Sequence, residues 1–533
     1  MEPSFLSLVP PLVTIALAIT TKRIFLSLGI GIALGALLFN QWNIVDSASQ
    51  VLEIAGGLII AEGWVTEEVY ILLFIVMLGV LTCFIRMLGG AQAFSEWAST
   101  KVKNRFQAQL ATIVLGFLIF FDDAFSSLVV GNVSRPLFDK YRISRAKLSY
   151  LVDSTAAPVI IMTPISGWAA FIASVMASIL AANEITEYSG YEAYLLTIPT
   201  NYYAITALLL VFAVAYFGIN FGPMRRHERL AVDEGILFDA SKGRVPGETD
   251  DQVPTRDDGK VGDLVTPVLT LIGATVAIAV WIGISGTDGT ITVMRILTNT
   301  DVILSLTIGG LAACAVALAK MLLKRNPAKQ TGAAFVAGVT SMLPAAAVLF
   351  LAWITAEIVG LLGVGEYLGT LADGSLSWSL LPVIFFLLSA VMSFSIGSTF
   401  GTFGLMLPIG AEIAASVDVS LLIPVFGAVL AGSIFGDHTS PLSDTTILSA
   451  VGSGIHLVDH VNTQLPYGLA CALASSIGYV TLGFTKNMGV GLIATLAALA
   501  VIIFLLKTKF SEEAAPVSEH AAQRSTEQKH PTG

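Results

Sequence analysis

Five aspartates lie inside or beside long apolar runs, and they are the residues whose types and spacing point most directly to chemistry. They are Asp122, Asp123, Asp153, Asp437 and Asp444. An ionisable side chain inside a membrane costs roughly 2.5–3.5 kcal/mol on insertion scales. A bound cation, a proton or a water-filled cavity must offset that cost. A helix cap could account for any one of these residues, but five of them favour a cation site.

Hydroxyl groups accompany these aspartates. Ser126 and Ser127 follow the first pair, and a second group follows Asp437: Ser440, Ser443, Thr445 and Thr446. Carboxylate and hydroxyl oxygens are hard ligands, which suit small hard cations. Pro158, Pro164 and the glycine-rich stretch 397–404 predict broken helices, whose freed carbonyls would add further oxygen ligands.

The histidines give a weaker signal. His438 follows Asp437 directly, and it could carry a proton or tune its neighbour, because imidazole titrates near neutral pH; a local hydrogen bond is the alternative. His456 and His460 are interpreted as solvated loop residues. With His438 they are too dispersed in the sequence to predict a zinc site.

Motifs typical of enzymes are absent from the sequence. It contains no GxxxxGK[ST] nucleotide-binding motif, no HExxH and no GxSxG. An aspartyl intramembrane protease built on Asp123 and Asp437 would lack the usual GxGD signature. We therefore expect neither catalysis nor a cofactor.

The composition predicts the environment of these residues. Only 12% of the 533 residues are charged, 55% are hydrophobic, and the mean hydropathy is +0.80. Soluble proteins average about 25% charged residues, and a net charge of −10 argues against a nucleic-acid partner. The chain is predicted to be an all-α polytopic membrane protein whose main partner is the lipid bilayer.

About 11–13 apolar segments are long enough to be membrane helices or parts of them. They lie near 4–20, 24–40, 70–88, 107–121, 148–182, 199–220, 263–283, 300–323, 334–364, 378–417, 419–436, 466–485 and 489–506.

Basic residues orient the first half, because Lys and Arg tend to stay in the cytoplasm. Basic clusters at 101–105 and 135–147 flank the apolar segment 107–134. Since both flanks are expected inside, this segment is predicted to be a re-entrant hairpin with its tip at 121–127. The loop 222–262 is also basic and is predicted to be a cytoplasmic linker after an N-terminal membrane half, 1–221.

Basic residues do not orient most of the second half, 263–506, since no Lys or Arg occurs between Lys329 and Lys486. If 378–417 folds back at 397–404, both flanks of 419–452 are external. Segment 419–452 is then a second re-entrant hairpin. Two inverted repeats, each with a hairpin and a broken helix, would bring the two tips together near the membrane midplane. The polar tail 507–533 is expected to be disordered.

At these motifs the sequence resembles the NhaC-type sodium/proton antiporter family. The matching stretches are FFDDAFSSLVVGNVSRP (120–136), RISRAKLSYLVDSTAAPV (142–159), SIGSTFGTFGLMLPI (395–409) and GDHTSPLSDTTILSA (436–450). The resemblance implies that the transport site, with its Na⁺, contains Asp122, Asp123, Asp153 and Asp437. It implies that the site is lined by Ser154, Thr155, Thr399, Thr402, Ser440 and Asp444.

We therefore expect an antiporter that exchanges sodium ions for protons across a prokaryotic inner membrane, with a homodimer as a candidate assembly. The alternative is a sodium- or proton-coupled carboxylate antiporter of the malate/lactate type, which the resemblance also allows. The sequence favours a cation as cargo, because no central Arg or Lys is expected to await a carboxylate. A passive channel is disfavoured, because the polar residues cluster instead of forming a continuous pore face.

Overall fold

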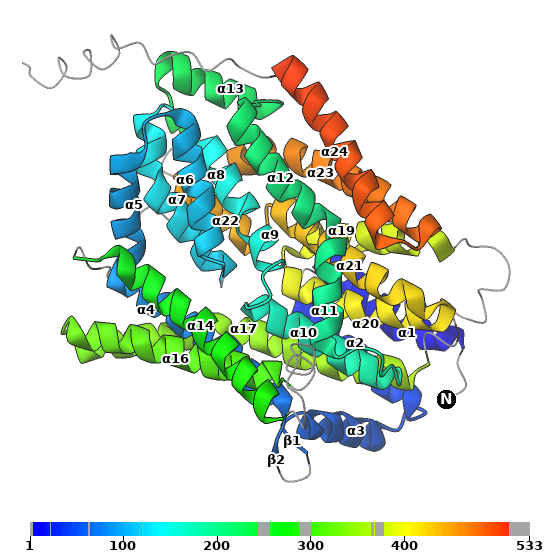
Figure 1. The fold of residues 1–533 in the computed structure, drawn as a ribbon. Coiled ribbons are helices and arrows are strands. Elements are labelled where there is room, and N and C mark those ends of the chain that lie inside the picture. The colour runs from blue at the N-terminus through cyan, green and yellow to red at the C-terminus, as the bar shows by residue number, and fades with distance from the viewer. Residues whose placement is uncertain are drawn as a thin grey trace, which may run out of the picture.

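The computed structural model describes residues 4–21, 23–61, 64–120, 122–242, 256, 258–286, 300–363, 367 and 378–510. Within these residues the protein is almost entirely helical (Figure 1). One small antiparallel sheet pairs β1 (Ile60–Ala61) with β2 (Trp64–Val65). The predicted all-α polytopic class is confirmed.

The helices of the first half are α1 (Phe5–Thr21), α2 (Ile24–Phe39), α3 (Ile44–Gly57), α4 (Glu67–Leu88), α5 (Gly90–Lys101), α6 (Arg105–Leu118), α7 (Asp123–Lys140), α8 (Arg145–Ser154), α9 (Ala157–Ile160), α10 (Gly167–Ala182), α11 (Gly190–Thr197), α12 (Tyr202–Phe217) and α13 (Pro223–Arg229). Those of the second half are α14 (Val261–Ser285), α16 (Val302–Leu323), α17 (Ala328–Leu361), α19 (Leu381–Ile396), α20 (Thr399–Val417), α21 (Leu422–Thr439), α22 (Asp444–Ser453), α23 (Leu457–Thr485) and α24 (Met488–Phe510). Short 3₁₀ or π turns lie at Ile198–Thr200, Leu230–Glu234, Ala240–Lys242, Trp378–Leu380 and Val419–Leu421.

Nine helices among the described residues are long and apolar enough to cross a membrane. A tenth span results if the bent pair Gly190–Thr200 and Tyr202–Phe217 is counted as one. The helix α24 continues to Phe510, so residues 507–510 of the expected tail are helical. The remainder of that tail, 511–533, lies outside the described residues, as does 243–255 of the linker.

Helices α6 and α7 form an antiparallel hairpin. Their outer ends meet, since Tyr141 Oη donates to the Val102 carbonyl at 2.8 Å and Arg105 donates to the Arg142 carbonyl at 3.2 Å. The turn lies between Leu118 and Asp123, so the serines at 126 and 127 belong to the start of α7.

The chain after this hairpin is a broken helix. Ser144 caps α8 by accepting a hydrogen bond from the Lys147 N–H, and α8 ends at Ser154. Pro158 lies at the start of the short α9, where its missing N–H costs nothing. Ser166 then caps α10. The break predicted from the prolines is therefore present between Ser154 and Gly167.

In the second half the structure differs from the expectation for 419–452. Asp418, just before α21, pairs with Lys486 at the C-terminal end of α23 at 2.5 Å. At the other end of α23, Asp459 pairs with Lys242 of the linker, and Arg145 donates to the Gly454 carbonyl that follows α22. The two ends of α21–α22 therefore lie at opposite ends of α23. This segment is a broken crossing helix and not a hairpin.

The hairpin of the second half is α19–α20. Gly397 turns the chain between these helices with φ +70°, and Ser398 caps α20. A Cβ on Gly397 would lie 2.5 Å from the carbonyl carbon of Leu442, so this turn contacts the break between α21 and α22. The expected hairpin at 419–452 is therefore wrong, and the reason is that no Lys or Arg between Lys329 and Lys486 marks the sides of the membrane in this part of the sequence.

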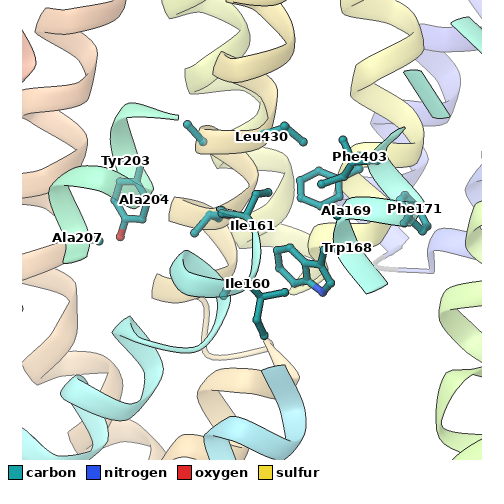
Figure 2. Packing of buried hydrophobic residues seen from close by; sticks show 14 of the residues in the cluster. Ile160, Ile161, Trp168, Ala169, Phe171, Tyr203, Ala204, Ala207, Phe403 and Leu430 are labelled. Atoms are coloured by element: carbon teal, nitrogen blue, oxygen red, sulfur yellow. The ribbon is translucent and has the colours of Figure 1, made fainter. Parts of the chain in front are cut away.

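Each half thus contains a hairpin followed by a broken helix. The inversion of one unit relative to the other stays a prediction. Aromatic rings join the two units: the ring centroid of Trp168 in α10 lies 5.7 Å from that of Phe403 in α20 (Figure 2). The ring of Phe400, also in α20, lies 5.4 Å from Trp168 between centroids. Such edge-to-face pairs add to the apolar burial and hold α10 beside the α19–α20 turn.

Candidate functional site

A cavity of about 400 Å³ lies where both hairpins and both broken helices meet α4 and α17. Its polar lining consists of Thr82, Cys83, Arg86, Asp122, Asp123, Ser341, Ser398, Thr399 and Asp444. Its apolar lining includes Phe25, Ile75, Leu78, Trp168, Met342, Pro344, Val348, Phe400 and Leu448. We refer to this space as the acidic cavity.

Three helices begin at the acidic cavity. They are α7 at Asp123, α20 at Thr399 and α22 at Asp444. A helix N-terminus carries unsatisfied N–H groups and partial positive charge, which stabilise a nearby carboxylate. The helix breaks therefore position the acidic side chains, and the helix N-termini lower the free-energy cost of burying their charge.

Arg86 corrects one premise of the sequence analysis, namely that no central Arg or Lys is present. It lies in the last turn of α4 and lines the acidic cavity. Ile75, Leu78, Thr82 and Arg86 recur at intervals of three and four residues, so they share one face of that helix. The periodicity of α4 was the signal that could have revealed it.

A second group of polar residues is buried beside the cavity. Oδ2 of Asp153 lies 3.1 Å from Nε2 of His460, accepts a hydrogen bond from Gln464 Nε2 at 2.6 Å and contacts Thr446 Oγ1 at 3.3 Å. Asp153 is 1% exposed and His460 is 0% exposed. The contacts join the broken helix α8 of the first half to α22 and α23.

His438 lies in this group, and both of its ring nitrogens are occupied. Nε2 is 2.9 Å from Ser154 Oγ, and Nδ1 is 2.7 Å from Tyr203 Oη. A neutral imidazole donates from one nitrogen and accepts at the other, so one hydroxyl accepts while the other donates. Gln464 Nε2 also donates to the carbonyl of His438. We refer to these residues, with Asp437, Ser443 and Thr445, as the buried polar cluster.

Only one of the two carboxylate oxygens of Asp437 has a hydrogen-bond partner among the described residues. Its Oδ2 accepts a hydrogen bond from Thr445 Oγ1 at 3.1 Å, and Thr445 is 2.9 Å from Ser443 Oγ. Within the described residues its Oδ1 has no partner, and the same is true of Gln464 Oε1. A buried acceptor without a partner is costly. A cation or a proton on Asp437 Oδ1 would offset this cost, and the amide oxygen of Gln464 would serve as a further ligand to a cation.

Asp444 connects the two groups. It lines the acidic cavity together with Asp123, and its Oδ1 accepts a hydrogen bond at 2.9 Å from the N–H of Thr445, whose hydroxyl donates to Asp437 at 3.1 Å. A line of carboxylates therefore runs from the cavity, through Asp444, to the buried polar cluster.

Helices α7 and α22 pack closely along this line. A Cβ on Gly452 would lie 2.6 Å from the Leu128 carbonyl oxygen, and one on Gly131 would lie 2.6 Å from the Gly452 carbonyl carbon. At the end of α22, Arg135 donates to the carbonyls of Val451 and Gly452 at 3.0 and 2.8 Å. A guanidinium at a helix C-terminus satisfies free carbonyls and complements their negative end.

The structure divides the predicted site residues among three settings. Asp122, Asp123, Thr399 and Asp444 line the acidic cavity, whereas Asp153, Ser154, Asp437, His438, Ser443 and Thr445 belong to the buried polar cluster. The hydroxyls of Thr155, Thr402 and Ser440 donate to backbone carbonyls of Leu151, Ser398 and Phe394 at the helix breaks. The four aspartates expected to bind Na⁺ are thus split between two neighbouring groups.

Sequence reasoning missed His460, Gln464, Tyr203 and Arg86. His460 and Gln464 are four residues apart in α23, which begins at Leu457, and so they lie on one helix face. Their polar surroundings led to a loop interpretation. The expectation that His460 is solvated is wrong, because it is fully buried. No group of three or more His, Cys, Asp or Glu side chains suited to a metal ion occurs in the described part of the chain.

Comparisons with known proteins agree with this architecture. An uncharacterised protein of Haemophilus influenzae is 40% identical over 509 residues, which cover 94% of this chain and 95% of that protein. Shorter stretches are similar to the malate-2H⁺/Na⁺-lactate antiporter of Bacillus subtilis (30% identity, 23% of this chain and 29% of that protein) and to the arginine/ornithine antiporter ArcD of Halobacterium salinarum (33% identity, 21% and 23%).

Among solved structures, the YdaH transporter of Alcanivorax borkumensis has a similar fold, with a TM-score of 0.52 at 14% identity over 83% of this chain and 89% of that one. Residues 159–484, which include the second hairpin, the broken helix α21–α22 and α23 but not Asp153 or Ser154, match the Na⁺/H⁺ antiporter family. Since this match covers more than half of the sequence, the chain belongs to the Na⁺/H⁺ antiporter family and is a multi-pass membrane transporter.

Proposed function

We propose that the protein exchanges sodium ions for protons across a prokaryotic inner membrane. The observation that carries this proposal is the half-satisfied carboxylate of Asp437. Among the residues that the structure describes, its Oδ1 is buried without a partner, beside the hydroxyls of Ser443 and Thr445 and one carboxylate away from the acidic cavity. A dehydrated Na⁺ or a proton would satisfy this oxygen.

The proposed exchange uses the line of carboxylates. Sodium enters the acidic cavity past Asp122 and Asp123, is passed on by Asp444, and binds at Asp437 with the free oxygen of Gln464 as a further ligand. A proton on the same carboxylate replaces the ion, so the cluster is never left with an uncompensated charge. Asp153 orients the cluster through His460 and Gln464, and no cofactor takes part.

A transport assay tests the proposal. Purified protein in proteoliposomes with an imposed pH gradient receives Na⁺, Li⁺, K⁺, malate or lactate in turn, and the change in internal pH is recorded. We expect Na⁺ to dissipate the gradient. If protons compete for the same oxygens, the apparent Na⁺ constant weakens about tenfold per pH unit for each competing proton on the acidic side.

Two results would contradict this assignment. An apparent Na⁺ constant that does not move between about pH 6 and pH 9 would exclude shared-site competition. Dissipation by malate or lactate, and not by Na⁺ alone, would instead favour the coupled carboxylate exchange that the sequence analysis kept as its alternative.

A further inference from the structure

Three titratable side chains follow one another at the start of α23, outside the sodium path proposed above. They are His456, Asp459 and His460, and their spacing of three and four residues places them on one face of the helix. Within the described residues each has a buried polar atom without a hydrogen-bond partner: Nε2 of His456, Oδ2 of Asp459 and Nδ1 of His460. We refer to these three residues as the α23 stripe.

The outer end of the α23 stripe reaches the solvent at the linker. Oδ1 of Asp459 pairs with Nζ of Lys242 at 2.5 Å, and the Lys242 side chain is 43% exposed. Lys242 also lies 3.8 Å from Oδ2 of Asp239. The pair with Lys242 uses one oxygen of Asp459 and leaves Oδ2 available to take up a proton.

The inner end of the α23 stripe contacts Asp153. His460 Nε2 lies 3.1 Å from Asp153 Oδ2, and Gln464 Nε2 donates to the same oxygen at 2.6 Å. An ionised carboxylate only accepts hydrogen bonds, so Nε2 of a neutral His460 carries its hydrogen and Nδ1 is an acceptor. Thr446 Oγ1 lies 3.3 Å from both Asp153 Oδ2 and the Asp437 carbonyl oxygen. One hydroxyl group therefore separates the end of the stripe from Asp437.

We propose that the α23 stripe is a proton path from the linker side to Asp153, separate from the acidic cavity through which sodium enters. Chains of Asp, Glu and His side chains within a membrane are suited to relaying protons. A small hard cation needs several oxygen ligands, whereas the stripe offers one carboxylate and imidazole nitrogens. The inference rests on the proposed function in taking sodium/proton exchange as the activity, and it adds the route of the proton.

The relay moves one proton through two side chains. Asp459 Oδ2 takes a proton from the solvent and passes it to Nδ1 of His460, directly or through one bridging water. The imidazolium then releases the hydrogen on Nε2 to Asp153 Oδ2, which becomes a neutral carboxyl group. Tautomerisation of His460, from Nδ1–H to Nε2–H, restores the starting state. Charged or titratable groups around the stripe include His227, Asp239 and Lys242 at the linker, and Asp153 and His438 in the interior.

Exchange of the C2 hydrogen of imidazole in D₂O, quantified by mass spectrometry on full-length protein in nanodiscs, measures proton access without relying on transport. The exchange proceeds through the protonated ring, so its rate rises where a histidine takes up protons from the solvent. His438 is the internal reference, because both of its ring nitrogens have hydrogen-bond partners. We expect His460 to exchange about tenfold or more faster than His438, since these hydrogen bonds must break before His438 is protonated.

Two variants locate the entry of the proton. Asp459→Asn should slow the exchange at His460 and leave His438 unchanged, because the amide cannot pass a proton on. Asp418→Asn is the matched control, since it removes a similar pair, with Lys486, at the opposite end of α23. It should change neither histidine.

His460→Gln separates proton delivery from sodium binding. Glutamine keeps an N–H that can donate to Asp153, but it cannot carry a proton. Proteoliposomes with Na⁺ on both sides and radioactive Na⁺ on one side measure Na⁺/Na⁺ exchange, which needs no proton, and a pH gradient measures Na⁺/H⁺ exchange. We expect Na⁺/H⁺ exchange to fall about tenfold or more, while Na⁺/Na⁺ exchange stays near the wild-type rate.

Three outcomes would overturn the inference. The first is exchange at His460 that is no faster than at His438 in the wild type. The second is normal Na⁺/H⁺ exchange in the His460→Gln variant, and the third is an equal loss of both transport modes, which would make His460 a positioning residue for Asp153.

Failure of the proposed function is distinct from these outcomes. The wild type would then show no Na⁺-dependent proton flux, although His460 exchanged rapidly and depended on Asp459. Thermal unfolding identifies any variant that fails to fold, and the comparison of His460 with His438 in the wild type does not depend on the variants.

Discussion

Asp153 Oδ2 lies 3.1 Å from His460 Nε2 in the closed interior, although 307 residues separate them along the chain. The contact joins the broken helix of the first half to α23 of the second, and Gln464 reinforces it. Any movement of one half against the other must therefore either carry this pair along or break it.

Asp437→Asn should reduce Na⁺-dependent proton flux to the level of empty liposomes, because the amide keeps the shape but has no charge and no proton to exchange. The protein should remain folded. Asp418→Asn, which changes an aspartate paired with Lys486 outside the membrane segments, should transport normally. Normal flux in the Asp437 variant would mean that this residue only shapes the helix break.

Gln464→Leu should impair both exchange and stability. Its amide donates to Asp153 at 2.6 Å and to the His438 carbonyl, and a buried acceptor that loses its donor costs about 1–3 kcal/mol. The exposed Gln92 provides the control Gln92→Leu. Thermal unfolding and proteoliposome flux measure the two effects. A Gln464 variant that matches the wild type in both would remove this residue from the site.

Gly452→Val should separate α7 from α22, because even a Cβ there would lie 2.6 Å from the Leu128 carbonyl oxygen. Overpacking of this kind costs about 1–3 kcal/mol, and the hairpin would shift away from Asp444. Gly273→Val in α14, where no atom lies within 4 Å of the added Cβ, should be tolerated. Equal flux in the two variants would show that close packing of α7 and α22 is not needed.

The protein should become less stable in acid because Glu228 loses its charge there. Burial alone would raise the pKa of Glu228, but Lys147 and Arg105 outweigh it and hold this pKa below its ordinary value of 4.5. The ionised group therefore stabilises the fold at neutral pH, and its contribution is lost as the pH falls below about 4.5 and through the folded pKa.

The variant Glu228→Gln tests this ion pair by thermal unfolding at pH 7 and in acid. It removes the ion pair of Glu228 with Lys147, whose side chain is 2% exposed, so we expect a loss of roughly 1.5–3 kcal/mol at neutral pH and a weaker dependence on acid. Glu234→Gln, at an exposed position nearby, should behave like the wild type. An unchanged acid profile in the Glu228 variant would contradict the assignment.

Cysteine accessibility tests the topology. Lys103→Cys, Arg142→Cys and Val458→Cys should react with an impermeant reagent from one side, and Lys486→Cys from the other. The wild type, which retains its three cysteines, gives the background labelling. Reaction of the Val458 variant from the side of Lys486 would restore the interpretation of 419–452 as a hairpin.

The sequence by itself determined the class of the protein, its apolar segments and most of its acidic site residues. These follow from local properties: an apolar run of sufficient length must be a membrane helix, and Asp122, Asp153 and Asp437 stand out because charge is rare within such runs. Pro158 and Gly397 likewise indicated breaks, since their effect on the backbone is local.

Only the tertiary structure decided which segments meet. Arg86 enters the cavity because one face of α4 packs there, and His460 and Gln464 reach Asp153 because α23 crosses α8, which no local pattern encodes. Tertiary contacts were also needed to assign each end of α19–α22 to one side of the membrane. That stretch has no Lys or Arg, so charge cannot distinguish the two sides.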